Sequence, residues 1–125
     1  MKSKGTQSWI FLSALFCVIL ASCTDYVIKP AKVIVPDSVK FKANIIPIFN
    51  ASCNHAGCHS TGGHAPDLSP ANAYTSLIYF GYVDTDTPEN SVIYQKITTG
   101  SMKGNATDQD RDLILKWIQQ GALNN

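Results

Sequence analysis

Two cysteines and a histidine stand close together in the run CNHAGCH at residues 53–59. Such a group suits covalent haem, because two thiols can add to the vinyl groups at one porphyrin edge while the next imidazole reaches the iron. A single zinc ion suits it less, since adjacent Cys58 and His59 would converge poorly on one tetrahedral centre. Haem-attachment motifs usually have two residues between the cysteines, and here Cys53 and Cys58 are separated by four. The run predicts haem attachment, with a disulfide, a zinc site or unrelated free thiols as alternatives.

A second iron ligand is expected from Met102. It is the only methionine apart from Met1, and it follows His59 by 43 residues in a segment bracketed by Gly100 and Gly104. A lone methionine commonly fills a gap in a core, but a thioether is also an axial haem ligand. We therefore expect Met102 to be an iron ligand in addition to His59.

The other two histidines, His55 and His64, lie within a few residues of His59. His55 is expected to face solvent. His64 follows two glycines and is an alternative second iron ligand, although a solvated loop histidine is the simpler interpretation. Three aromatic side chains are candidates for hydrogen bonds to haem propionates, or for core packing: Tyr79, Tyr82 and Trp117.

The first 22 residues predict an export signal, with Lys2 and Lys4 ahead of an apolar stretch that is short for a membrane span. The stretch ends in LASC at residues 20–23, which resembles the lipobox of bacterial lipoproteins and predicts lipidation of Cys23. An uncleaved signal anchor is the alternative. The protein is thus expected to be exported and held at a bacterial membrane by lipid, on the periplasmic or outer-surface side.

Removal of 22 of the 125 residues leaves 103, which is enough for one domain. Lys2 and Lys4 leave with the signal, so that 8 basic residues face 9 acidic ones, and this balance excludes a nucleic-acid-binding patch. Residues 23–37 are expected to form a linker that begins with the lipidated Cys23. The segment contains two prolines and no helical period, which predicts an extended tether, with a short edge strand as the alternative. The folded domain is expected at residues 38–125.

Four helices are predicted in this domain. The first begins at Ser38, buries one face and is kinked or ended by Pro47. The second and third begin at the pairs Ser69-Pro70 and Thr87-Pro88 and end near Gly81 and Gly100. The fourth starts at Thr107, with Asp110 placed for a capping box, and ends at Gly121.

Residues 41–122 resemble the class I single-haem cytochromes c, particularly short bacterial domains with a Trp-Ile-x-x-Gly-Ala tail, which here spans residues 117–122. The resemblance implies an all-α bundle of about four short helices around one haem c, with the first helix crossing the last. It implies that His59 is the proximal iron ligand and Met102 the distal one. Lys103 stands where the family commonly has proline.

The function expected from these features is single-electron transfer between redox protein partners, rather than enzymatic catalysis. One alternative is a haem enzyme with an open distal face, which would require that Met102 does not bind iron. The other is a structural lipoprotein that is stapled by a disulfide or binds zinc.

Overall fold

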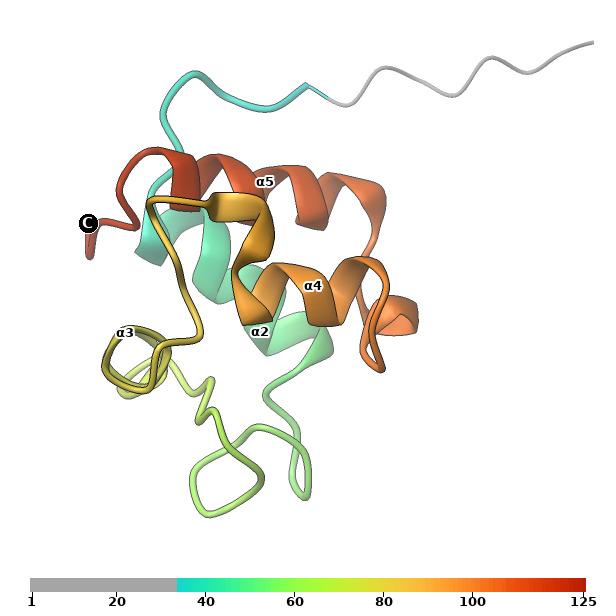
Figure 1. Ribbon diagram of the computed structural model, residues 1–125. Helices are drawn as coiled ribbons and strands as arrows, with labels where there is room; N and C mark the ends of the chain where they lie inside the picture. Colours follow the sequence, from blue (N-terminus) through green and yellow to red (C-terminus); the bar gives the residue numbers. More distant parts are fainter. Residues whose placement is uncertain (1–33) are drawn as a thin grey trace, which may run out of the picture. The chain divides into compact units, whose positions relative to one another are not determined.

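The computed structural model describes residues 34–125, which form an all-α domain (Figure 1). Within these residues there are four α-helices and no strand, so the predicted fold class is confirmed at the level of all-α. The elements in chain order are η1 (Phe41–Ile45), α2 (Ile46–Ser52), α3 (Ala73–Tyr79), η2 (Pro88–Asn90), α4 (Val92–Thr98), η3 (Lys103–Asn105) and α5 (Asp108–Gln119).

The first predicted helix is present as two joined segments, the π-helical turn η1 and the α-helix α2. Pro47 lies in the first turn of α2, where its missing N–H costs least. The proline therefore marks where regular α-helix begins, and does not end it. The predicted apolar face is buried, and it consists of Phe41, Ile45, Ile48 and Phe49.

The second predicted helix begins later than expected, at Ala73. The N–H of Ser69 donates to Asp67 Oδ1 at 2.9 Å, and the carbonyl of Ser69 accepts from Ala73 N at 2.8 Å. These bonds hold residues 69–72 in turns that precede α3. Gly81 adopts a left-handed φ of 70°, as expected of a glycine that ends a helix.

The third predicted helix is interrupted at Ser91. Pro88 starts only the short η2, and α4 begins after Ser91, whose ψ of 130° is extended. Ser91 is 1% exposed, and its hydroxyl accepts from Asp84 N at 2.9 Å and donates to Asp84 O at 3.1 Å. Because this side chain fastens the loop before α4, its backbone leaves the helical path.

The fourth predicted helix, α5, has the expected capping box between Thr107 and Asp110. It packs against η1, and the Phe41 and Trp117 rings lie 5.0 Å apart between centroids. Past α5, Gly121 takes a φ of 89°, and the N–H of the buried Ala122 donates to Trp117 O at 3.0 Å. The two ends of the domain therefore pack on each other.

The predicted signal at residues 1–22, Cys23 and most of the predicted tether lie outside the described residues. Residues 34–37 contain no helix or strand. No helix in the described part of the chain is long and apolar enough to cross a membrane.

Candidate functional site

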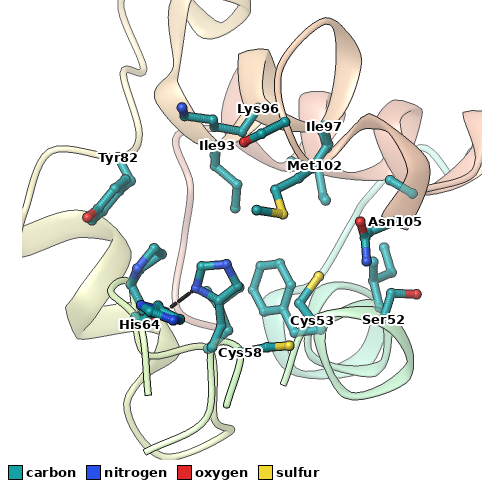
Figure 2. Close-up of a pocket in the computed structure, with 18 of the residues that line it drawn as sticks. Ser52, Cys53, Cys58, His64, Tyr82, Ile93, Lys96, Ile97, Met102 and Asn105 are labelled. Atoms are coloured by element: carbon teal, nitrogen blue, oxygen red, sulfur yellow. Dashed lines mark hydrogen bonds between the residues drawn. The ribbon is translucent and has the colours of Figure 1, made fainter. Parts of the chain in front are cut away.

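A cavity of about 400 Å³ opens between α2, α4 and the loop of residues 57–68 (Figure 2). Its walls are mainly apolar, and four of the side chains proposed from sequence line it together. The apolar walls include Ile48, Phe49, Leu68, Ile93, Ile97 and Ile114, and the four proposed residues are Cys53, Cys58, His59 and Met102.

The four residues between the two cysteines form a turn. Cys53 is the C-cap of α2 and its N–H donates to Phe49 O at 2.9 Å. Cys58 N donates to His55 O at 2.9 Å, and Gly57 adopts a left-handed φ of 78°, which glycine does without strain. His59 N then donates back to Cys53 O at 3.2 Å. Both cysteines therefore reach the same cavity despite the four residues between them.

His55, inside this turn, does not line the cavity. It is exposed, and its Nε2 donates to Ala51 O at 3.2 Å. The expectation that His55 faces solvent is confirmed.

His59 is held by hydrogen bonds at both its side chain and its backbone. Its Nδ1 lies 3.0 Å from Pro66 O and 3.1 Å from His64 O. Carbonyl oxygens only accept, so Nδ1 carries the proton and Nε2 keeps its lone pair for a metal. The carbonyl of His59 accepts from Leu68 N at 2.7 Å, which closes the loop around the imidazole.

His64 lies on the Nδ1 side of the His59 ring, because its own carbonyl is one of the two acceptors. Figure 2 shows His64 on the same side of the cavity as Cys58, with Met102 across the space. The chain therefore brings His64 to the cavity from behind His59, away from the side on which Met102 lies.

Met102 enters from the segment that joins α4 to η3, and it is 37% exposed. Its N–H donates to Lys96 O at 2.9 Å, and its carbonyl accepts from Asn105 N at 2.9 Å. Gly100 allows the close return of this segment, since a Cβ there would lie 2.9 Å from Lys96 Cα. The thioether reaches into the cavity opposite the sulfur atoms of Cys53 and Cys58 (Figure 2).

Charge is sparse around the cavity. Apart from histidines, Lys96 is the one lining residue in the described chain with a formal charge at neutral pH. The pKa of the Cys53 thiol is raised, chiefly by burial and further by the negative charges of Asp110 and Cys58. Cys53 therefore stays protonated as a thiol at neutral pH.

The three aromatic residues proposed as partners of haem propionates have different environments in the structure. Tyr82 lines the cavity, on the far side from the cysteines in Figure 2. Trp117 is fully buried and its Nε1 donates to Leu123 O at 3.0 Å. Tyr79 is 80% exposed and does not line the cavity. Only Tyr82 remains a candidate partner for an anionic group in this cavity.

Several contributors to the site were not foreseen from sequence: the carbonyl of Pro66, Lys96 on the cavity wall, and Arg111, which binds the loop that carries Met102. A backbone acceptor leaves no trace in residue type, so the role of Pro66 had no sequence signal. Arg111 follows the predicted capping box by one residue, and its polarity alone gave no indication of burial.

Among residues 34–125, no three His, Cys, Asp or Glu side chains are grouped to hold a metal ion, and Cys53 and Cys58 are free thiols. Comparison of the chain with protein-family models, curated proteins and solved structures found no match. The proposals below therefore rest on the residues and their geometry.

Proposed function

We propose that this protein is a single-haem c-type electron carrier. The observation that carries the proposal is the composition of one cavity. Both thiols of the attachment motif, an imidazole with a free Nε2 and a thioether line the same apolar space. When bound, the haem iron supplies reversible one-electron chemistry between its ferric and ferrous states.

The cavity fits such a group in size and in the character of its walls. Its volume of about 400 Å³ lies in the range of roughly 300–1,000 Å³ usual for cofactor sites. Ile93, Ile97 and Leu68 supply apolar surface and exclude water from the interior. Lys96 and Tyr82 stand on the side away from the cysteines, where propionates opposite the attached edge would find a cation and a phenol.

Cys53 and Cys58 would hold the porphyrin covalently. Each thiol would add its S–H across one vinyl C=C bond, so that sulfur bonds to one carbon and hydrogen to the other, and no atom is lost. Burial raises the pKa of the Cys53 thiol, so its sulfur carries a proton at neutral pH. The turn through Gly57 is what allows both sulfurs to act at one porphyrin edge.

His59 and Met102 would complete the iron coordination from opposite sides. The two carbonyl acceptors at Nδ1 orient the imidazole of His59 and leave Nε2 as the nitrogen that can bind a metal. Met102 would supply the softer ligand, and a thioether favours the ferrous state and a higher reduction potential. We propose, together with this assignment, that the all-α domain has a cytochrome c-like fold around one haem.

We also propose that the carrier is exported and tethered to a membrane by lipid at Cys23, as an electron donor and acceptor for other redox proteins. The support is the sequence at residues 1–23, which combines an export signal with a lipobox-like end. A Cys23→Ser variant is expected to lose acylation and membrane retention while it keeps its haem spectrum.

The deciding test is covalent attachment, measured on protein made in a host that attaches haem to exported proteins. The wild-type protein is expected to gain the mass of one haem and to stay coloured after denaturation. A double variant, Cys53→Ala with Cys58→Ala, is expected to lose both properties. His55→Ala is the matched control within the same motif, and it should keep them.

The alternatives predict other results. A mass lower by two hydrogens, without colour, would identify a disulfide-stapled protein. Colour that is extracted from denatured wild-type protein by acid acetone would contradict two thioether bonds. A covalent haem in the wild type with neither a sulfur ligand nor a ligand from His64 would favour the open-faced enzyme.

A further inference from the structure

Arg111 on α5 joins three segments of the domain through one side chain. The side chain is only 17% exposed, although it is charged. Its Nε donates to Ile97 O at 2.8 Å and its Nη2 donates to Lys103 O at 2.6 Å. Its Nη1 pairs with Asp108, a carboxylate that is 88% exposed. The guanidinium thus connects the end of α4, the start of η3 and the first turn of α5.

The two carbonyls that accept from Arg111 flank Met102 in the chain. Ile97 lies in the last turn of α4, where helix carbonyls have no partner within the helix. Lys103 directly follows Met102. Both sides of the methionine loop are therefore fastened to α5 by the same planar group, which presents several donors in a fixed fork.

The remaining bonds of the loop are local. Met102 N donates to Lys96 O at 2.9 Å and Lys103 N donates to Gly100 O at 3.2 Å. These bonds shape the turn, but they do not join it to α5. In the described chain, Arg111 is the side chain whose hydrogen bonds tie this turn to the helix that packs against η1.

We propose that Arg111 is a positioning residue, which holds the loop so that the Met102 thioether stays directed at the iron. The inference rests on the proposed function, since it concerns the ligand of a bound haem. Thioether sulfur favours the ferrous state, so retention of Met102 in the ferric protein depends more on the loop being held in place.

Three variants of the haem-loaded protein test this role. Arg111→Met removes both loop hydrogen bonds while keeping much of the aliphatic volume. Arg111→Lys keeps the charge but cannot present the same fork to two carbonyls. Asp108→Asn removes the exposed partner alone and is the matched control.

The measured quantities are the pH at which the ferric sulfur-to-iron absorption band is lost, the reduction potential, and amide hydrogen exchange of residues 99–106. For Arg111→Met, we expect the pH of band loss to fall by about one unit, which is a tenfold weaker hold on the thioether. The potential should fall, and exchange should rise in residues 99–106 but not in α2. Arg111→Lys should give intermediate shifts, and Asp108→Asn should give none. If Arg111→Met does not fold, the same shifts in Arg111→Lys decide the question.

The inference is overturned if the band, the potential and the loop exchange are unchanged in both arginine variants. It is also overturned if exchange rises while the band and potential stay as in the wild type, because Arg111 would then stabilise the loop without affecting the ligand. Failure of the proposed function is seen separately, in the wild-type protein, as absence of covalent haem or of the band.

Discussion

Hydrogen bonds within the protein hold the imidazole of His59 in one orientation without a bound metal. Two carbonyls accept from its Nδ1, and its own carbonyl accepts from Leu68 N. A ring held in this way has one tautomer and one direction for its free nitrogen, so little conformational entropy would be lost if that nitrogen bound iron. The arrangement supports the proposal that His59 is the first iron ligand, with Met102 on the other side of the cavity.

Substitution of Met102 tests the second ligand. The oxidised wild-type protein is expected to show the weak absorption band of ferric iron bound to thioether sulfur, and Met102→Ala should remove it. The reduction potential should fall, because water or nitrogen ligands favour ferric iron more than a thioether does. His64→Ala is the control, since His64 approaches from behind His59. A band absent from the wild type, with a spectrum altered only by His64→Ala, would transfer the distal role to His64.

Asp67 makes the loop behind His59 sensitive to acid. Hydrogen bonds from Ser69, with further ones from Asn72 and Thr61, lower the pKa of its carboxyl from 3.8 to about 2. A depressed pKa in the folded state means that the stabilisation is complete above the unfolded pKa. It is lost as the pH falls from about 4 through 2. Asp67→Asn should therefore lower stability at neutral pH and flatten the loss of stability between pH 4 and pH 2.

Acid titration followed by circular dichroism measures this effect. Asp112→Asn, at an exposed position on α5, makes the same change of charge and is the control. Equal pH profiles for Asp67→Asn and the wild type would show that these hydrogen bonds do not contribute to stability.

The ends of a helix were predicted best from the sequence where a single local signal determines them. The capping box of Thr107 and Asp110 and the terminal Gly121 bound α5 as expected, because both are interactions within a few residues. The predicted starts of the second and third helices were too early. There, Asp67 accepts from the N–H of Ser69 two residues later, and Ser91 binds backbone atoms of Asp84 seven residues earlier. These local side-chain bonds compete with helical hydrogen bonds and displace the helix starts.

In the proposed site, too, some features were predictable from the sequence and others were not. The residue types at Cys53, Cys58 and His59, and the uniqueness of Met102, were sufficient to choose side chains that the fold brings to one cavity. The interactions that orient these side chains were not predictable. The hydrogen bonds of His59 to the Pro66 carbonyl and of Arg111 to the Lys103 carbonyl depend on how the folded chain places these backbone groups. The sequence pattern therefore indicates which side chains take part, but not which backbone groups hold them in place.

The capping box of α5 is expected to stabilise the start of this helix. Thr107 Oγ1 accepts from Asp110 N at 3.2 Å, and Asp110 Oδ2 accepts from Thr107 N at 2.9 Å. Thr107→Ala removes one of these reciprocal bonds and should lower the free energy of unfolding by about 1 kcal/mol. Urea denaturation measures the change. Thr99→Ala is the control, since Thr99 is exposed and its hydroxyl makes only a 3.4 Å contact to Gln95 O. Equal effects of the two substitutions would show that the cap is not specific.

For the whole molecule, several residues of the hydrophobic core also line the cavity. Phe41, Phe49 and Trp117 pack where η1 meets α5. Ile48, Phe49, Ile93, Ile97 and Ile114 belong to the same buried cluster and also line the cavity. A domain of this size has little apolar surface to bury, so an apolar occupant of the cavity, such as the proposed haem, would add to the core.

If the proposed haem is bound, we expect it to stabilise the fold in addition to its proposed role in electron transfer. Protein made without haem attachment should have a lower free energy of unfolding, by a few kcal/mol, because an apolar group that fills a core cavity stabilises only the folded state. It should also bind a hydrophobic fluorescent dye at the unfilled walls, whereas haem-loaded protein should not. Urea denaturation of the two forms at equal concentration measures the first effect, and dye fluorescence measures the second. If the haem-free form unfolds at the same urea concentration with the same slope and binds no dye, the cavity closes on itself. The apolar walls would then be self-sufficient, and haem would add a redox centre to a fold that does not depend on it.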